Sequence, residues 1–317
     1  MTYQQSGQAP FAFKLRDDLD NLPDVLRQHE THFHTMLTHD PDTNEMYYAL
    51  LNVGVVMLSA DMQTHTILPL PDNLKTMNFH SVRLYIMEGK KRLVLTANDH
   101  QQVLVLTLDG TVDFTLGRPI LEPYQSEDAV YKPTDTVLVD NKLYIADGYG
   151  DQYIVVADMT SREWVSYFGG KTENRTEQGK FRTAHSIVLT PDGQNLLIVD
   201  RWNSRLQIHD FDGQFVASQS LPYDAWLCGI DFVEWNGQYY GVIACLYDVD
   251  EDKKNPAPIY IVDNSYQIIS TIRPKEDFGI QEAQRLHNAI WHVYDNRLFL
   301  VCHSWNTGKY FILEQVV

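Results

Sequence analysis

The stretch KLYIADGYGDQYIVV (142–156), together with NLLIVDRWNSRLQIH (195–209), decides the fold of this chain. In each, an apolar strand ends at an aspartate, a short polar turn follows, and a second apolar strand begins. Four further copies of the pattern are YYALLN ending at Asn52, RLVLTAN at Asn98, YYGVIAC at Cys245 and RLFLVC at Cys302. The six copies recur at intervals of 45 to 57 residues. A repeat of this length with several short strands is typical of a β-propeller blade.

The repeat predicts an all-β fold, a six-bladed β-propeller, formed by a single domain over residues 1–317. The copies fill the chain from about His32 onward, so residues 1–30 are expected to be a lead-in segment ahead of the first blade. Asp-Gly pairs at Asp109-Gly110 and Asp212-Gly213 fit the hairpin turns that such blades need.

Composition narrows the classes of partner. The chain has 317 residues and a formal net charge of −17, which disfavours binding to nucleic acid or to anionic membranes. It contains neither an apolar run of about 20 residues nor an N-terminal secretory signal. Its three cysteines are widely spaced and odd in number, unlike a disulfide framework. These features predict a cytoplasmic protein that acts on a small-molecule substrate.

A second set of equivalent positions lies 13 to 18 residues before each strand end, at the start of the preceding strand. These pairs are Phe33-His34, Phe79-His80, Pro133-Thr134, Ala184-His185, Leu227-Cys228 and Leu286-His287. The innermost strand of each blade lines the channel, so the second member of each pair is expected to lie in a ring around the axis. His80, His185 and His287 come from alternating blades, and three imidazoles with an open position are typical of a catalytic zinc. One zinc ion per chain is therefore expected, although imidazole also suits copper, iron and nickel.

Several motifs resemble the lyase domain of the peptidylglycine α-amidating enzymes, which are six-bladed propellers of the NHL-repeat type. They are PTDT (133–136), DGY (147–149), AHS (184–186) and VDRWNSRLQ (199–207), within a similar region over residues 131–213. The resemblance implies a zinc ion on His80, His185 and His287, with Tyr149 as the catalytic base and Arg201 beside it. It also implies cleavage of an α-hydroxyglycine unit into an amide and glyoxylate.

The chain departs from that family in three places. A first-blade arginine that receives the substrate carboxylate in the family is replaced by LNVG (51–54). The aspartate after the last zinc histidine is Asn288 here, and its amide oxygen would be a weaker ligand for a calcium ion. The cysteines that form disulfides in the family are missing. Candidates for contacting the substrate instead are His34, Arg83, His100 and His303, all near strand ends.

Three hypotheses follow. The leading one is a zinc-dependent lyase that cleaves a C–N bond in a small α-hydroxylated amide-like substrate. The second is a metal-dependent hydrolase, such as a lactonase, on the same fold. The third is a non-enzymatic NHL-repeat scaffold that binds a partner. Metal content separates the scaffold from the enzymes, and product analysis separates the lyase from the hydrolase.

Overall fold

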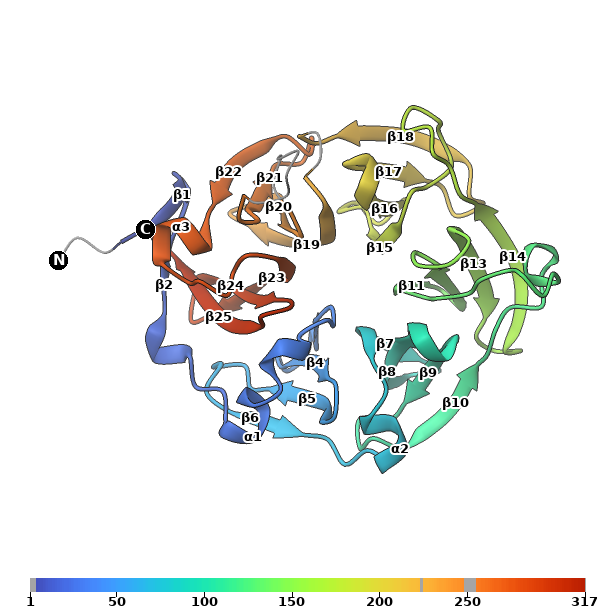
Figure 1. Cartoon of the computed structure of the whole chain (residues 1–317), viewed down its shortest axis with the longest axis horizontal. Helices are drawn as coiled ribbons and strands as arrows, with labels where there is room; N and C mark the ends of the chain where they lie inside the picture. The colour runs from blue at the N-terminus through green and yellow to red at the C-terminus, as the bar shows by residue number, and fades with distance from the viewer. Residues whose placement is uncertain (1–3, 223–224, 248–254, 317) are drawn as a thin grey trace.

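Six antiparallel β-sheets surround a central axis in the computed structural model of the chain, which describes residues 4–222, 225–247 and 255–316 (Figure 1). Five of the sheets have four strands and the sixth has five. This arrangement confirms the predicted six-bladed β-propeller.

The blades follow one another along the chain. Blade 1 contains β3 (Thr38–His39), β4 (Met46–Leu50), β5 (Gly54–Leu58) and β6 (His65–Ile67). Blade 2 contains β7 (Phe79–Met87), β8 (Lys90–Ala97), β9 (Gln102–Leu106) and β10 (Val112–Leu116). Blade 3 contains β11 (Asp135–Val139), β12 (Lys142–Ala146), β13 (Tyr153–Asp158) and β14 (Glu163–Gly169).

The second half of the ring repeats this plan. Blade 4 contains β15 (Ala184–Leu189), β16 (Leu196–Asp200), β17 (Arg205–His209) and β18 (Phe215–Ser220). Blade 5 contains β19 (Leu227–Trp235), β20 (Gln238–Cys245), β21 (Ile259–Val262) and β22 (Ile268–Ile272). Blade 6 contains β23 (Leu286–Tyr294), β24 (Arg297–Ser304), β25 (Lys309–Gln315), β2 (Phe11–Leu15) and β1 (Ser6–Gln8).

Helical segments are short and lie in the connections. They are α1 (Asp24–Arg27), α2 (Asp72–Lys75), α3 (Pro274–Phe278), η1 (Asp17–Leu19), η2 (Glu30–His32), η3 (Asn98–His100), η4 (Glu122–Tyr124) and η5 (Arg201–Asn203). Within the described part of the chain, none is a helix of the length and apolarity that a membrane span requires.

The middle strands of each blade are buried on both faces because every sheet packs between two neighbouring sheets. All five residues of β16 are buried, whereas most residues of the outer strand β18 of the same blade are at least partly exposed. A strand that is covered on both faces reads as a continuous apolar run and not as an alternating one. This burial explains why the strand ends LLIVD and KLYIA were visible as a repeat.

The start and the end of the described chain meet in blade 6. Strand β2 pairs with β25 in an antiparallel register that places Phe13 opposite Gln315 and Leu15 opposite Leu313 (Figure 1). Phe11 and Phe13 are fully buried against the core. The expected lead-in segment at 1–30 therefore includes two strands of a blade. These strands do not appear in the repeat because they lie almost 300 residues from the rest of that sheet.

The inner strands β7, β11, β15, β19 and β23 all begin at the same end of the ring. Because each inner strand is antiparallel to the next strand of its blade, the second strands end there too; Ala184 of β15, for example, pairs with Asp200 of β16. We call this end of the propeller the site end. The turns after the second strands, which carry Tyr149 and Arg201, lie at the site end with the starts of the inner strands.

Candidate metal centre and active site

All three predicted metal ligands lie on β-bulges at the starts of their strands. Phe79 of β7 pairs with Ala97 and Ser81 pairs with Thr96, so His80 has no partner in β8. The registers of β15 and β23 skip His185 and His287 in the same way. A bulge inserts one unpaired residue and redirects its side chain. The same local irregularity therefore presents an imidazole to the channel in blades 2, 4 and 6.

The imidazoles of His80, His185 and His287 lie close together. The ring centroids of His80 and His185 lie 4.5 Å apart, those of His80 and His287 5.0 Å, and those of His185 and His287 5.1 Å. All three side chains are at most 1% exposed. Burial, followed by nearby positive or ionisable groups, lowers the pKa of each well below its usual value. They are therefore neutral near pH 7, which is the form that binds a metal.

Backbone carbonyls of the following blade orient two of these rings. Nδ1 of His80 donates to the carbonyl of Thr134 at 2.7 Å, and Nδ1 of His185 donates to the carbonyl of Cys228 at 2.8 Å. Because a carbonyl only accepts, each Nδ1 carries the proton and each Nε2 keeps its lone pair. This is the second-layer hydrogen bonding that commonly fixes metal-binding histidines.

His287 shows most directly that the residues fit a metal. Both of its ring nitrogens are buried, and neither has a hydrogen-bond partner in the described part of the chain. Buried polar atoms are nearly always paired, so an imidazole that lacks any partner needs an explanation. A metal ion bound to one nitrogen would give that atom a partner and leave the other nitrogen unpaired.

His34 was expected to be the residue of blade 1 that lies in the ring around the axis, but the structure places Thr35 there. Thr35 Oγ1 contacts the carbonyls of Ala49 and Phe79 at 2.7 and 2.8 Å. In blade 3, Thr134 Oγ1 contacts the equivalent carbonyls, that of Ala146 in the same blade and that of Ala184 in blade 4, at 3.2 and 3.0 Å. Thr35, and not His34, is therefore the ring residue of blade 1, and the sequence alignment of this blade was wrong by one residue.

His34 nevertheless belongs to the histidine cluster. One nitrogen from each of His34, His80 and His287 lies within 4.8 Å of the others, and this group could hold a metal ion. It is the one cluster of at least three histidine, cysteine or acidic side chains with such spacing among the described residues. It contains His34 in place of the expected His185. Its members are all histidines, so the cluster beside Asn288 lacks the carboxylate ligands that calcium favours.

Tyr149 and Arg201 lie against this cluster. The Tyr149 hydroxyl lies 3.1 Å from His80 Nε2 and 3.0 Å from His185 Nε2, and Arg201 Nη1 donates to it at 3.1 Å. Arg201 Nη2 also contacts His185 Nε2, and its Nη2 lies 3.1 Å from Cys228 Sγ. Burial raises the pKa of the Tyr149 phenol, and the Arg201 charge opposes that rise.

A tight turn holds Tyr149 in place. A Cβ on Gly148 would overlap the carbonyl oxygen of Ala184, and a Cβ on Gly150 would overlap the Asp147 carboxylate. The turn thus requires glycine on both sides of Tyr149. The Asp147 carboxylate accepts hydrogen bonds from the backbone amides of Lys132 and Asp151 and from the Tyr124 hydroxyl, which anchors the turn to the connection between blades 2 and 3.

Gln152 is a positioning residue that the sequence analysis missed. Its Nε2 donates to the carbonyls of Gly148 and Gly150 at 2.9 Å, and its Oε1 accepts from the amides of Thr183 and Ala184. One buried amide therefore ties the Tyr149 turn to the strand that carries His185. No motif marks this residue, because a lone glutamine after a turn has no distinctive spacing.

The acidic residue before Arg201 is not its partner. Asp200 Oδ2 accepts from Arg205 Nε at 2.8 Å, which neutralises its charge, and from the Asn203 side-chain amide. Arg201 instead donates its Nε to the carbonyl of Leu227 at 3.1 Å. The guanidinium is left to face Tyr149 and the histidines.

The other candidates for substrate contact are either engaged elsewhere or exposed, and His303 lies near enough to His287 to lower the pKa of that imidazole. Arg83 binds Asp135 through both carboxylate oxygens, at 2.8 and 2.6 Å. His303 is buried in a stack with Phe33, at a centroid distance of 4.1 Å. His100 lies at the site end in η3 and is exposed.

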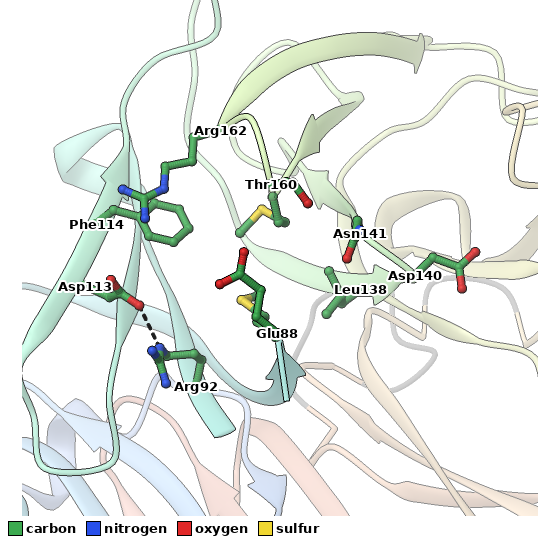
Figure 2. A pocket seen from close by; sticks show the side chains of 11 residues that line it. Glu88, Arg92, Asp113, Phe114, Leu138, Asp140, Asn141, Thr160 and Arg162 are labelled. Carbon is green, nitrogen blue, oxygen red and sulfur yellow. Dashed lines mark hydrogen bonds and ion pairs between the residues drawn. The ribbon is translucent and has the colours of Figure 1, made fainter. Parts of the chain in front are cut away.

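One of two pockets borders the Tyr149 turn, and the other lies far from it. A pocket of about 290 Å³ at the site end is lined by Tyr149, Arg182 and Trp202 among others, and it gives access to the Tyr149 turn. Figure 2 shows a second pocket between blades 2 and 3, in which Arg92 pairs with Asp113. That pocket lies at the opposite end of the blades and includes none of the predicted site residues.

Comparisons with known proteins agree with the fold and include one short match to an amidating enzyme. No family model matches the chain. Over 104 residues, 32% of the chain, it is 29% identical to peptidyl-glycine alpha-amidating monooxygenase A of Xenopus laevis. That match spans 11% of the length of the Xenopus protein.

Solved structures with the same fold share little sequence with the chain. A gluconolactonase of Xanthomonas campestris superposes with a TM-score of 0.60 at 11% identity, covering 93% of this chain and 94% of that one. Streptogramin B lyase superposes with a TM-score of 0.58 at 14% identity, covering 95% and 97%. At these identities the likeness establishes the propeller fold alone.

Proposed function

We propose that the chain is a metal-dependent lyase, with one zinc ion per chain, that cleaves a C–N bond in a small α-hydroxylated amide-like substrate. One observation carries the proposal: the Tyr149 hydroxyl lies within 3.1 Å of His80 Nε2, His185 Nε2 and Arg201 Nη1. A single phenol oxygen thus faces two candidate ligands and a buried cation. The partial match to an amidating enzyme supports the same chemistry.

Each residue of the site would have a separate role in the reaction. His80, His185 and His287 would hold the metal through their Nε2 atoms. A zinc ion there would act as a Lewis acid that lowers the pKa of the substrate hydroxyl and of the nearby phenol. Arg201 also favours the phenolate form of Tyr149, because its positive charge lowers the pKa of that phenol.

The reaction balances with these groups alone. Tyr149 takes the proton of the substrate hydroxyl, and the electron pair of that O–H bond forms the carbonyl of the aldehyde product. The C–N bond breaks, its electron pair stays on nitrogen, and the nitrogen receives a proton to become the amide. Tyr149 returns to phenolate when it passes its proton on, which makes it base and then acid.

The surroundings of the site support a small substrate without a fixed carboxylate partner in blade 1. The turn at 51–54 carries no cation, and Leu50 before it is buried in the core. The pocket beside Tyr149 contains Lys171 and Arg182, but Glu173 lies 3.7 and 3.2 Å from these two cations. Apart from Arg201, which contacts Tyr149 itself, a carboxylate in this pocket would meet only cations that already pair with Glu173.

The test is product release by the full chain loaded with zinc. An N-acyl-α-hydroxyglycine and its methyl ester are incubated with the protein, and glyoxylate or its ester is quantified beside the amide. Equimolar amide and aldehyde from either compound supports the proposal. Absence of both products with zinc in place would reject the lyase, and hydrolysis of a lactone by the same protein would favour the hydrolase instead.

A further inference from the structure

His34 breaks the pattern of the repeat at the metal centre. Its position directly precedes the ring residue Thr35. The residues that precede the ring in the other five blades are all apolar: Phe79, Pro133, Ala184, Leu227 and Leu286. The other blades place an apolar side chain at this position. The imidazole of His34 therefore needs an explanation that is specific to blade 1.

The cluster is symmetric about the His80–His287 pair. The His34 ring centroid lies 4.6 Å from that of His80 and 4.5 Å from that of His287. The corresponding distances for His185 are 4.5 and 5.1 Å. His34 and His185 therefore lie at similar distances from the His80–His287 pair. His34 belongs to blade 1, whereas His185 belongs to blade 4.

The spacing of the ring nitrogens agrees with a ligand role for His34. One ring nitrogen of His34 lies within 4.8 Å of nitrogens of His80 and His287. Nitrogens bound to one ion at about 2.1 Å lie at most roughly 4.2 Å apart, so small side-chain shifts would complete the set.

We propose that His34 is a fourth imidazole ligand of the channel metal, which is then held by His34, His80, His185 and His287. The inference rests on the proposed function only in assuming that the channel binds a metal. Four neutral imidazoles fill a tetrahedron, so binding of the substrate oxygen requires an ion that accepts five or more ligands. Divalent zinc with an expanded shell, iron, nickel or copper would meet that requirement.

The experiment counts imidazoles without using a substrate. The purified full chain is loaded with zinc, and X-ray absorption at the metal edge gives the number of imidazole ligands in the wild type and in His34→Gln. His100→Gln is the matched control, because His100 is exposed at the same end of the propeller. Circular dichroism establishes that each variant is folded, and His34→Asn replaces His34→Gln if the latter is not.

The expected result is four imidazoles in the wild type and in His100→Gln, and three in the His34 variant. The His34 variant should also bind zinc about 10- to 100-fold more weakly, as when a ligand-supporting contact is lost. Three imidazoles in all proteins, or no bound metal, would overturn the inference. These readouts need no turnover, so four imidazoles without amide release would reject only the proposed reaction.

Discussion

The Tyr149 hydroxyl accepts a hydrogen bond from Arg201 Nη1 at 3.1 Å, so a base candidate and a buried cation meet beside the histidines. If this phenol is the base, Tyr149→Phe should retain both the metal and the fold but lose turnover. A positioned base contributes about 10²- to 10⁴-fold, and kcat should fall by that factor. Steady-state assays and elemental analysis of the same preparation check this. A variant with unchanged kcat would assign the base to another group.

Arg201 should set the pH at which Tyr149 becomes active. Its charge lowers the pKa of the phenol, whereas burial raises it. Arg201→Gln removes the positive charge that lowers the pKa of Tyr149, so the phenolate should form only at higher pH. The acidic limb of the pH profile, where activity rises as Tyr149 loses its proton, should therefore move to higher pH, and the profiles of kcat for wild type and variant measure the shift. A shift toward lower pH, or none, would contradict the role of the guanidinium.

The turn that carries Tyr149 should not tolerate a methyl group at Gly148. Its Cβ would overlap the backbone oxygen of Ala184, which cannot move without disturbing the strand that carries His185. Gly148→Ala should lower the free energy of unfolding by about 1–3 kcal/mol, as for other overpacked sites. Gly117→Ala is the matched control, because a Cβ there meets nothing within 4 Å. Denaturant unfolding compares the two, and equal stabilities would contradict this account of the turn.

Much of the fold was predictable because the blades repeat. Buried strands such as LLIVD at 196–200 read as apolar runs at near-constant spacing, and the repeat placed His80, His185 and His287 on equivalent bulges. The strands β1 and β2 were not predictable in this way. Their partners lie at the other end of the chain, and no local pattern identifies such a pairing.

The site was predictable only where it followed the repeat. His34 was assigned to the ring by its spacing, but hydrogen bonds show that Thr35 is the equivalent residue. Gln152 was missed because its function lies in four backbone contacts that no sequence motif records. Arg83 was a candidate for binding the substrate, but it forms an ion pair with Asp135. The sequence does not reveal this pair because the two side chains come from different blades.

His303 should make the protein sensitive to acid through its burial in the core. Burial lowers its pKa to about 3, whereas an exposed histidine in the unfolded chain titrates near 6.5. Between these values the unfolded state binds the extra proton, so stability is complete above about pH 6.5 and falls as the pH drops. The loss is about 1.4 kcal/mol per pH unit for this one group.

His303→Phe should reduce that dependence, since phenylalanine fills the stack with Phe33 without titrating. Its free energy of unfolding should fall less between pH 7 and pH 5 than that of the wild type, by about 2 kcal/mol. Urea unfolding at the two pH values gives both differences. The comparison within each protein removes any constant effect of the larger ring, and identical differences would show that His303 is not buried in its neutral form.

The metal content of the purified chain tests the central claim most directly. After incubation with zinc and removal of excess ion, mass spectrometry of the metal should give about one ion per chain for the wild type and for His100→Gln. His80→Gln, His185→Gln and His287→Gln should each lose most of that metal while remaining folded, because losses around a metal site commonly cost about 10- to 100-fold or more in affinity. A wild type without bound metal, or full occupancy in all three variants, would contradict the account.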